Sequence, residues 1–447
     1  MRAEKYFGCL AAATLAMLAS AACAPIVRRD ISSAGGGASG GGGGDPSGGV
    51  TGTGGGDPSG GVTGTGGGDP SGGVTGTGGA TDTGGVTDTG GVTGTGGVTG
   101  TGGVTTTGTT TGVGGLGGTT STVCGVNTSY GWASTPSLMD PVSDGSHSLV
   151  GIKAPSLVFY NSKYHVFATV LNTAGTPTIE HIQFADWPNA TSATVEYLDN
   201  TKAFGSGRSQ PQIFYFNAKK TWYLISQGPA PAYSTNADLG MTANWTAPTN
   251  FYASTPTIVT QNAGSGGIGW TDFWIICDAT NCFMFFTNQK GYLFRSQTSA
   301  ANFPSGFGDP VVVMQSSYLV QGGRIYKVSG GSIAYLMLIE GTGSGGAYIG
   351  AWSATALDGK WTALAETEAN PFAHATSTAS GSGGNITFAG TVWTWDVGHG
   401  ELVRSTYDET MTVDNCNMRY LYAGKDHFAA AKAEPYPWKL GLLVRSK

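Results

Sequence analysis

The sequence predicts an all-β fold: a five-bladed β-propeller that follows a signal peptide and a disordered linker rich in Gly and Thr. Three observations predict it. Glycine is concentrated in one stretch before the main domain, and helix-period patterns are nearly absent after that stretch. Long β-hairpins instead return at a spacing of roughly 50–65 residues, which is typical of propeller blades. A generic β-sandwich is the alternative, but it does not predict so regular a return.

The first hairpin sets the pattern for the others. Residues 155–160 read as a strand, 161–163 as an Asn-Ser-Lys turn and 164–169 as a second strand. Aromatic and β-branched residues bounded by Asn, Gly or Lys are strand signals. Further hairpins of this form are expected at 211–216 with 221–225, 272–277 with 282–286, 323–328 with 333–338, and 400–404 with 411–413.

Composition separates the chain into unlike parts. Of 447 residues 76 are Gly, and 41 of these lie between Gly35 and Gly118. The remaining domain, residues 124–447, is long enough to bury one large core. Charged residues make up 11% of the chain and the net charge is −6, which argues against a nucleic-acid partner. The Gly-rich stretch lacks the three-residue period of collagen.

Residues 1–23 resemble a bacterial export signal. Arg2 and Lys5 precede an apolar run, and small residues then lead to Cys23. Two outcomes stay open, a lipidated Cys23 that anchors the protein to a membrane or free secretion after cleavage. Both make the protein secreted or displayed on the cell surface, where disulfides persist.

Residues 24–123 form a low-complexity segment. A twelve-residue unit begins at Asp45 and recurs at Asp57 and Asp69, and a six-residue unit follows. One Val per unit buries too little apolar surface to offset chain entropy, so we expect a flexible tether. A calcium-binding β-roll is disfavoured because one Asp per unit supplies too few ligands.

Four cysteines remain in the domain. Cys277 and Cys282 are separated by four residues, so we expect them to form one local disulfide, which leaves Cys124 to pair with Cys416. Four cysteines allow three pairings, and a zinc site is the rival interpretation. Zinc is the weaker one, since the usual couples of close Cys and His ligands are missing.

Several long motifs in the domain resemble glycoside hydrolase family 62. They occur in the family's order over about residues 124–447, and they lie at 151–168, 208–216, 270–278, 295–298, 399–405 and 437–443. The resemblance implies a five-bladed propeller with an axial active site. It also implies α-L-arabinofuranosidase activity, which releases arabinose side chains from arabinoxylan with inversion.

An inverting glycosidase needs one carboxyl group as base and a second as acid. The resemblance places the base at Ala154, where the family's Lys-Asp-Pro reads Lys153-Ala154-Pro155. It places the acid at Gln321, where Phe-Glu-Ala is usual. Only the third carboxylate, Asp272, matches; in the family it tunes the acid and orients the sugar. Carboxylates that could stand in are Asp140, Asp144 and Glu340.

Other residues of the motifs retain the character of a sugar site. Lys153 and Arg208 are expected to donate to sugar hydroxyls, and Trp270 to stack on a sugar face. The resemblance places His399 opposite a structural calcium ion in the channel, and no cofactor is required for the chemistry. Glu401 and Arg404 are expected to form an internal ion pair.

The expected protein is therefore a tethered, exported propeller that acts on polysaccharide, with arabinoxylan or arabinan-type side chains as substrate. We expect a monomer with no nucleic-acid partner. The rival, from another functional class, is a catalytically impaired xylan-binding propeller, because the base and acid positions are substituted. A purely structural surface protein is the third interpretation, and it predicts no binding to xylan.

Overall fold

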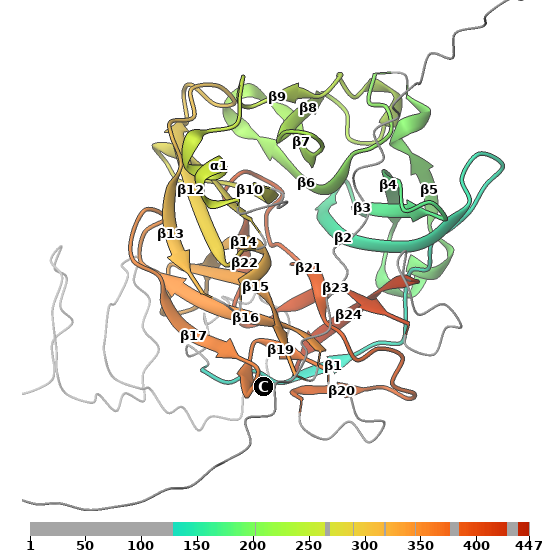
Figure 1. The fold of residues 1–447 in the computed structure, drawn as a ribbon. Coiled ribbons are helices and arrows are strands. Elements are labelled where there is room, and N and C mark those ends of the chain that lie inside the picture. Colours follow the sequence, from blue (N-terminus) through green and yellow to red (C-terminus); the bar gives the residue numbers. More distant parts are fainter. Residues whose placement is uncertain are drawn as a thin grey trace, which may run out of the picture. The chain divides into compact units, whose positions relative to one another are not determined.

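The computed structural model describes residues 128–446, apart from Lys202, Gln289 and Gly345 and the segments 264–268, 317–318, 376–383 and 427–436. These residues form a propeller-like arrangement of β-sheets (Figure 1). Helices in this part of the chain are short. They are α1 (Thr257–Asn262) and four 3₁₀ segments, η1 (Trp187–Ser192), η2 (Leu198–Asn200), η3 (Asn217–Lys219) and η4 (Thr242–Asn244). The predicted all-β fold is confirmed, and by length and hydropathy none of these helices could span a bilayer.

Four sheets contain an antiparallel meander of four consecutive strands, as expected for blades. The first has β2 (Leu149–Tyr160), β3 (Lys163–Asn172), β4 (Pro177–Phe184) and β5 (Thr194–Tyr197). The second has β6 (Ser209–Phe216), β7 (Thr221–Gln227), β8 (Ala232–Asn236) and β9 (Thr249–Asn250). The third has β10 (Thr271–Cys277), β11 (Asn281–Thr287), β12 (Tyr292–Ser299) and β13 (Val311–Gln315). The fourth has β14 (Leu319–Ser329), β15 (Tyr335–Gly343), β16 (Gly346–Ala354) and β17 (Thr362–Thr367).

The fifth sheet is assembled differently from the four meanders. Its order is β20 (Ile386–Phe388), β1 (Trp132–Ser134), β24 (Trp438–Arg445), β23 (Arg419–Lys425) and β21 (Gly398–Leu402). It therefore combines both ends of the described chain, and β1 pairs with β20 in parallel. The regular repeat expected from the sequence is thus found in four sheets, and the fifth departs from it.

The expected hairpin of residues 400–404 with 411–413 is wrong. Strand β21 pairs instead with β23, and β22 (Thr412–Asp414) pairs in parallel with the end of β14. The fourth sheet also gains β18 (Asn370–Pro371) on β17 and β19 (Ala373–His374) on β16. The physical reason is that the edge of β14 offers unpaired backbone groups to residues 412–414, which a two-strand pattern in the sequence cannot reveal.

The hairpin of β2 and β3 confirms the first predicted repeat. Asn161 and Ser162 form its two-residue turn with φ of 48° and 60°, the left-handed backbone that such tight turns need. Burial is continuous along several strands, for example Phe283–Phe286 on β11, because neighbouring sheets cover both faces. Such strands read as unbroken apolar runs rather than alternating ones.

Side chains link each inner strand to the next near the centre. Ser156 Oγ on β2 accepts from Ile213 N (3.0 Å), and Gln212 Oε1 on β6 accepts from Ile275 N (2.7 Å). The remaining links are Trp274 Nε1 on β10 to Ile325 O (2.8 Å), Leu402 N on β21 to Tyr326 Oη (3.1 Å), and Leu157 N on β2 to Glu401 Oε2 (3.1 Å). The last link returns to the first strand, so the hydrogen bonds form a closed cycle through five inner strands.

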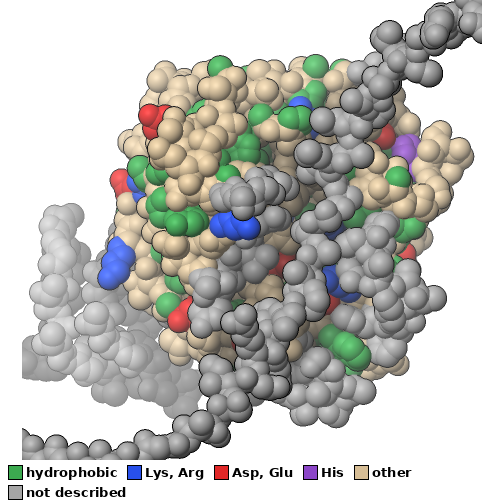
Figure 2. Space-filling model, viewed as in Figure 1, with side chains coloured by type: hydrophobic (Ala, Val, Ile, Leu, Met, Phe, Trp, Pro, Cys, Tyr) green, Lys and Arg blue, Asp and Glu red, His purple; other side chains and the backbone are tan. Residues whose placement is uncertain are grey.

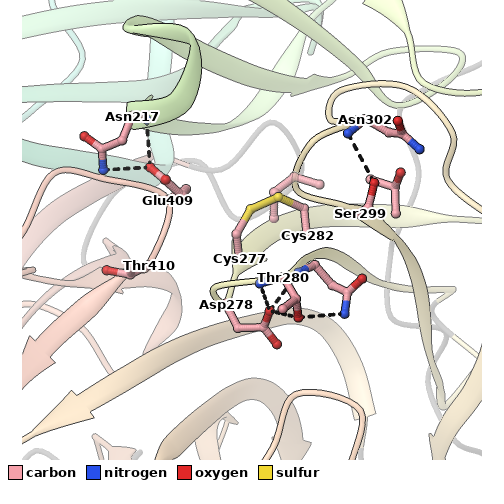
Figure 3. The surroundings of a disulfide bond; sticks show 12 residues. Asn217, Cys277, Asp278, Thr280, Cys282, Ser299, Asn302, Glu409 and Thr410 are labelled. Carbon is pink, nitrogen blue, oxygen red and sulfur yellow. Dashed lines mark hydrogen bonds between the residues drawn. A yellow bond between two sulfur atoms is a disulfide. The ribbon is translucent and has the colours of Figure 1, made fainter.

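The predicted local disulfide is confirmed. Cys277 and Cys282 face each other across the β10–β11 hairpin and are bonded (Figure 3), which leaves no thiolates there for zinc. Cys416 is also disulfide-bonded. Because Cys124 lies outside the described residues, the Cys124–Cys416 pairing stays a prediction. The signal peptide and the linker also lie outside them.

Glu180 on β4 should make stability fall as the pH rises. Its side chain is buried, and burial raises its pKa from the ordinary value of 4.5 to about 8. Between these values the folded protein holds a proton that the unfolded chain releases, so the free energy of unfolding decreases with pH. We expect Glu180→Gln to flatten the decline in unfolding free energy between pH 5 and pH 8. Chemical denaturation at both pH values measures it.

Glu196→Gln is the matched control, because Glu196 lies on the adjacent strand β5 and is only partly buried. That variant should keep the pH dependence of the wild type. If the unfolding free energy of Glu180→Gln falls with pH as much as that of the wild type, the Glu180 carboxyl is not the cause of the pH dependence.

Candidate active site

One backbone feature recurs on four inner strands. Ala154, Gln210, Asp272 and Gly322 all have positive φ, at 50°, 51°, 60° and 87°. Each coincides with an irregularity in the pairing of its strand with the next strand of the same sheet. A non-glycine residue in this conformation costs of order 1 kcal/mol or more, and such strain concentrates at functional sites. The repeated kink brings these positions to one level of the ring.

Asp272 lies at this level and is 6% exposed. Its Oδ2 accepts from Gly322 N (3.2 Å), and its Oδ1 lies 3.2 Å from His399 Nε2. Burial alone would raise the pKa of Asp272. The charge of His399, hydrogen bonds from His399 and Gly322, and the charge of Arg324 outweigh it and hold the pKa below the usual value. Asp272 is therefore an anion that faces the centre of the ring.

The backbone of Asp272 is held by two amide side chains. Its N–H donates to Gln210 Oε1 (3.1 Å) and Gln227 Oε1 (3.0 Å), and Thr271 Oγ1 also donates to Gln227 Oε1 (2.7 Å). These contacts stabilise the left-handed conformation that aims the carboxylate. Sequence reasoning missed Gln210 and Gln227, since no local pattern relates them to Asp272.

His399 connects Asp272 to a second carboxylate. Its Nδ1 lies 3.2 Å from Glu340 Oε2, and the same oxygen accepts from His399 N (2.8 Å). Burial lowers the pKa of His399, but the two carboxylates raise it more strongly, to about 9. The row Asp272–His399–Glu340 is thus an imidazolium between two carboxyl groups.

Both ring nitrogens of His399 face carboxyl groups, Nε2 that of Asp272 and Nδ1 that of Glu340. Within the described ranges, no group of three or more His, Cys, Asp or Glu side chains is arranged to hold a metal. The calcium ion implied by the resemblance stays a prediction.

Glu340 is the only one of the three suggested stand-in carboxylates that lies at this site. Its Oε1 accepts from Gln321 Nε2 (3.3 Å), directly beside the acid position. Asp140 contacts Ser137 and Lys439 in an exposed position. Neither it nor Asp144 is part of the Asp272 site, so for them the stand-in hypothesis is wrong.

Asp144 belongs to the outer edge of the first sheet. It lines an open pocket there with Val142, Glu196 and Tyr197, and its Oδ1 lies 2.8 Å from His147 Nδ1. In this sheet β2 is the innermost strand and β5 the outermost. Asp144 lies beside β5, so its part of the loop before β2 is far from the centre. The spacing of residues in the sequence could not show on which side this loop lies.

Ala154 is 2% exposed and provides no proton-binding group at the base position. Its left-handed φ is one that Asn and Asp adopt more readily than Ala, so the backbone there suits an Asp better than the residue present. The site therefore has two carboxylates, Asp272 and Glu340, but neither is at the expected base or acid position.

The two basic residues lie next to the kinked positions in sequence, Lys153 before Ala154 on β2 and Arg208 two residues before Gln210. Lys153 Nζ lies 5.9 Å above the ring of Trp438. Arg208 is half-buried over Gly228, where a Cβ would come within 2.7 Å of its Nη1. Burial lowers the pKa of Arg208. No carboxylate of the described residues pairs with it, which leaves its charge available to a ligand.

The sugar-stacking role expected of Trp270 is not supported. Its ring is 6% exposed and packs against Tyr252, Phe273 and Phe286. These three aromatic rings surround it, and the sequence alone could not distinguish this packing from an open site. By contrast, the predicted ion pair of Glu401 and Arg404 is confirmed, with Oε1 and Nε 2.7 Å apart.

The site thus consists of two buried carboxyl groups joined by an imidazolium at the centre of a propeller, and carboxyl groups are the catalytic groups of glycoside hydrolases. Comparison with known proteins agrees. Residues 131–444 match the model of Glycosyl hydrolase family 62, and the chain belongs to this family.

Named relatives were found in sequence and in structure. The chain is 36% identical over 337 residues to α-L-arabinofuranosidase C of Cellvibrio japonicus; the match covers 74% of this chain and 49% of that protein. The chain thus spans about half the length of this curated relative. The catalytic domain of the family 62 α-L-arabinofuranosidase of Coprinopsis cinerea is 42% identical, with a TM-score of 0.66, covering 72% and 98% of the two chains.

Two solved relatives carry oligosaccharides. A Podospora anserina α-L-arabinofuranosidase in complex with cellotriose is 38% identical, covering 72% of this chain and 98% of that one. A family 62 hydrolase in complex with xylotriose is 37% identical, covering 71% and 98%. Both have a TM-score of 0.66.

Proposed function

We propose that this protein is an α-L-arabinofuranosidase that acts on arabinose side chains of arabinoxylan by inverting hydrolysis. The observation that carries the proposal is the position of Asp272, which is buried, ionised and aimed into the centre of the ring beside Gly322 and His399. Family membership and the named relatives support the same activity.

Each part of the site has a role in this proposal. Asp272 accepts hydrogen bonds from arabinose hydroxyls and orients the ring, while Lys153 and Arg208 donate to hydroxyl oxygens. Gln321 hydrogen-bonds the glycosidic oxygen without protonating it, since an amide has no acidic proton at neutral pH. Ala154 borders the space that the attacking water occupies but cannot deprotonate it. Turnover is therefore expected to be slow.

The same two substitutions raise a second candidate function, which the named relatives do not favour. Acid and base assistance each contribute typically 10²–10⁴-fold to such reactions. With Ala154 and Gln321 in place, the site suits an arabinoxylan-binding propeller that retains recognition and has lost most of its hydrolysis. The two candidates share the ligand and differ in the reaction.

Arabinose release from wheat arabinoxylan separates them. Slow release that Asp272→Asn abolishes supports the hydrolase. Binding of arabinoxylan in affinity electrophoresis without release above the no-protein blank supports the binding protein. The control is Glu196→Gln on β5, the outer strand of the first sheet, and it should behave as wild type. Gln227→Glu would not serve as a control, because Gln227 accepts a hydrogen bond from the backbone of Asp272. If the protein neither releases arabinose nor binds arabinoxylan, both functions are contradicted.

The fifth sheet is inferred to complete a five-bladed propeller. The closed cycle of hydrogen bonds through β2, β6, β10, β14 and β21 supports this, because β21 occupies the inner position that the first strand has in each meander. Pairing β1 from the start of the domain with β24 from its end would fasten the ring.

Export, tethering and a monomeric state are part of the proposal. The basic start and apolar run of residues 1–23 support export to the cell surface or medium, and the Cys277–Cys282 bond fits an oxidising compartment. Residues 24–123 would give the propeller, residues 124–447, reach from a lipidated Cys23 or from a partner. Mass spectrometry of the mature N-terminus tests the lipid directly.

A further inference from the structure

A cluster of aromatic rings is exposed away from the site. Tyr160 is 36% and Tyr407 39% exposed, Tyr215 is partly exposed, and Trp222 lies buried beneath them. Ring centroids are 4.9 Å apart for Tyr160–Trp222, 5.2 Å for Tyr160–Tyr407 and 5.3 Å for Tyr215–Trp222. We call Tyr160, Tyr215 and Tyr407 the distal aromatic patch.

The distal aromatic patch lies at the end of the inner strands opposite to the site. Tyr160 is the last residue of β2, six residues beyond Ala154, and Tyr215 follows Gln210 by five residues on β6. At about 3.3 Å per strand residue, the patch lies roughly 20 Å from the level of Asp272. A group bound there does not touch the reacting sugar.

The patch is held rigidly. Tyr215 N donates to Tyr407 O (2.9 Å), and Asp408 Oδ1 accepts from Thr406 Oγ1 (3.0 Å) and Thr410 N (3.0 Å), which fixes the turn that follows Tyr407. This turn is also fastened to the second sheet, where Glu409 Oε2 accepts from Asn217 (Figure 3). Pre-positioned rings lose little conformational entropy on binding.

The chemistry of the patch fits a neutral ligand rich in hydroxyl groups. In the part of the chain that the structure describes, the hydroxyl groups of Tyr160, Tyr215 and Tyr407 make no hydrogen bond, so all three can donate and accept. The nearby carboxylates of Asp408 and Glu409 are already occupied. On the face of the molecule drawn in Figure 2, charged side chains are scattered rather than gathered in one patch. Three lysines also lie at this end of the sheets: Lys163 pairs with Tyr160 across the first turn, and Lys219 and Lys220 are exposed in the turn between Tyr215 and Trp222. Their ammonium groups can donate to hydroxyl oxygens at the margin of the patch.

We propose that the distal aromatic patch is a second carbohydrate site, which binds the β-linked xylose backbone of xylan by stacking sugar rings on the tyrosine faces. Aromatic faces provide large apolar contact area, and the phenol groups add hydrogen bonds at their edges. The identity of the polysaccharide rests on the proposed function. The site would hold the protein on insoluble xylan while the central site remains open to arabinose side chains.

The test measures retention of the full chain on insoluble, unsubstituted β-1,4-xylan, which offers no arabinose to the central site. The variants are Tyr160→Ala with Tyr407→Ala, and Tyr160→Leu with Tyr407→Leu, which keeps apolar volume over Trp222. Each is compared with wild type in the Asp272→Ala background. The matched control is Phe159→Ala, because Phe159 is 48% exposed on the same strand but points to the other side.

We expect both double variants to weaken retention about tenfold and Phe159→Ala to leave it unchanged. Equal retention by wild type and double variants, an equal loss in Phe159→Ala, or no retention of wild type would overturn the second site. Sedimentation provides one further outcome. A wild-type dimer that the double variants convert to monomer would assign the patch to contact between copies instead. Failure of arabinose recognition at Asp272 leaves this result unaffected, so the two proposals fail separately.

Discussion

Restoring the two missing carboxyl groups, by Ala154→Asp together with Gln321→Glu, should raise arabinose release from arabinoxylan by about 10⁴-fold or more. Each group supplies typically 10²–10⁴-fold as base or acid. The backbone at Ala154 already has the left-handed φ that Asp tolerates, so the change at 154 needs no backbone rearrangement. Initial rates of arabinose release measure the effect.

Glu340, the neighbour of position 321, should favour the protonated form of a carboxyl group introduced there. Gln321 Nε2 lies 3.3 Å from Glu340 Oε1, so a carboxyl group introduced at 321 would lie against a second carboxyl group. A like charge at that distance raises the pKa of one member of the pair, which keeps a general acid protonated at neutral pH. The single change Gln321→Glu should therefore gain less than the double change and about as much as the base-position control, since both carry the acid and lack the base.

That control is Ala154→Asn with Gln321→Glu. Asn has the size and backbone preference of Asp but cannot accept a proton, so most of the gain should be missing. If the double carboxyl variant releases no more arabinose than the wild type, the central site has diverged beyond these two positions.

Removing the guanidinium of Arg404 should destabilise the protein by about 3–5 kcal/mol, as expected when one partner of a buried ion pair is lost. Arg404 and Glu401 are fully buried, and Arg404 Nη2 also donates to Leu157 O (2.8 Å) and Ile213 O (2.7 Å). Arg404→Met would leave the charge of Glu401 and two carbonyl groups without these partners. The free energy of unfolding from denaturant titration measures the loss.

Lys439→Met is the matched control. Lys439 Nζ lies 3.5 Å from Asp140 and 3.3 Å from Asp426, but these side chains are partly exposed. Removing such a pair costs about 0–1 kcal/mol, because water screens it. A loss at Arg404 no larger than at Lys439 would show that the central ion pair does not hold the first, second and fifth sheets together.

The fold could be predicted where it depends on local pattern. The turn at Asn161–Ser162, the strands on either side of it and the Cys277–Cys282 bond all follow from residues close in sequence. The fifth sheet could not be predicted in this way. Its register depends on β1 meeting β24 from the other end of the domain, and residues 412–414 pair with β14 rather than with β21.

The site was predicted in part. Motifs placed Asp272 and His399 but could not show that one imidazolium joins Asp272 to Glu340, since residues 272, 340 and 399 meet only when the ring closes. Trp270 packs against Tyr252, Phe273 and Phe286, and residue type alone could not show that packing. Gln210 and Gln227 act through the backbone of Asp272, and a contact of that kind leaves no trace in a local motif.

The most direct test of the central claim is calorimetric titration with an arabinofuranosyl-substituted xylotriose, comparing wild type with Asp272→Asn. The account predicts that the wild type binds this ligand and that the variant binds it at least tenfold more weakly, because the amide cannot replace an anion held between Gly322 and His399. Equal affinity of the two proteins would contradict it, since the arabinose would then lie elsewhere.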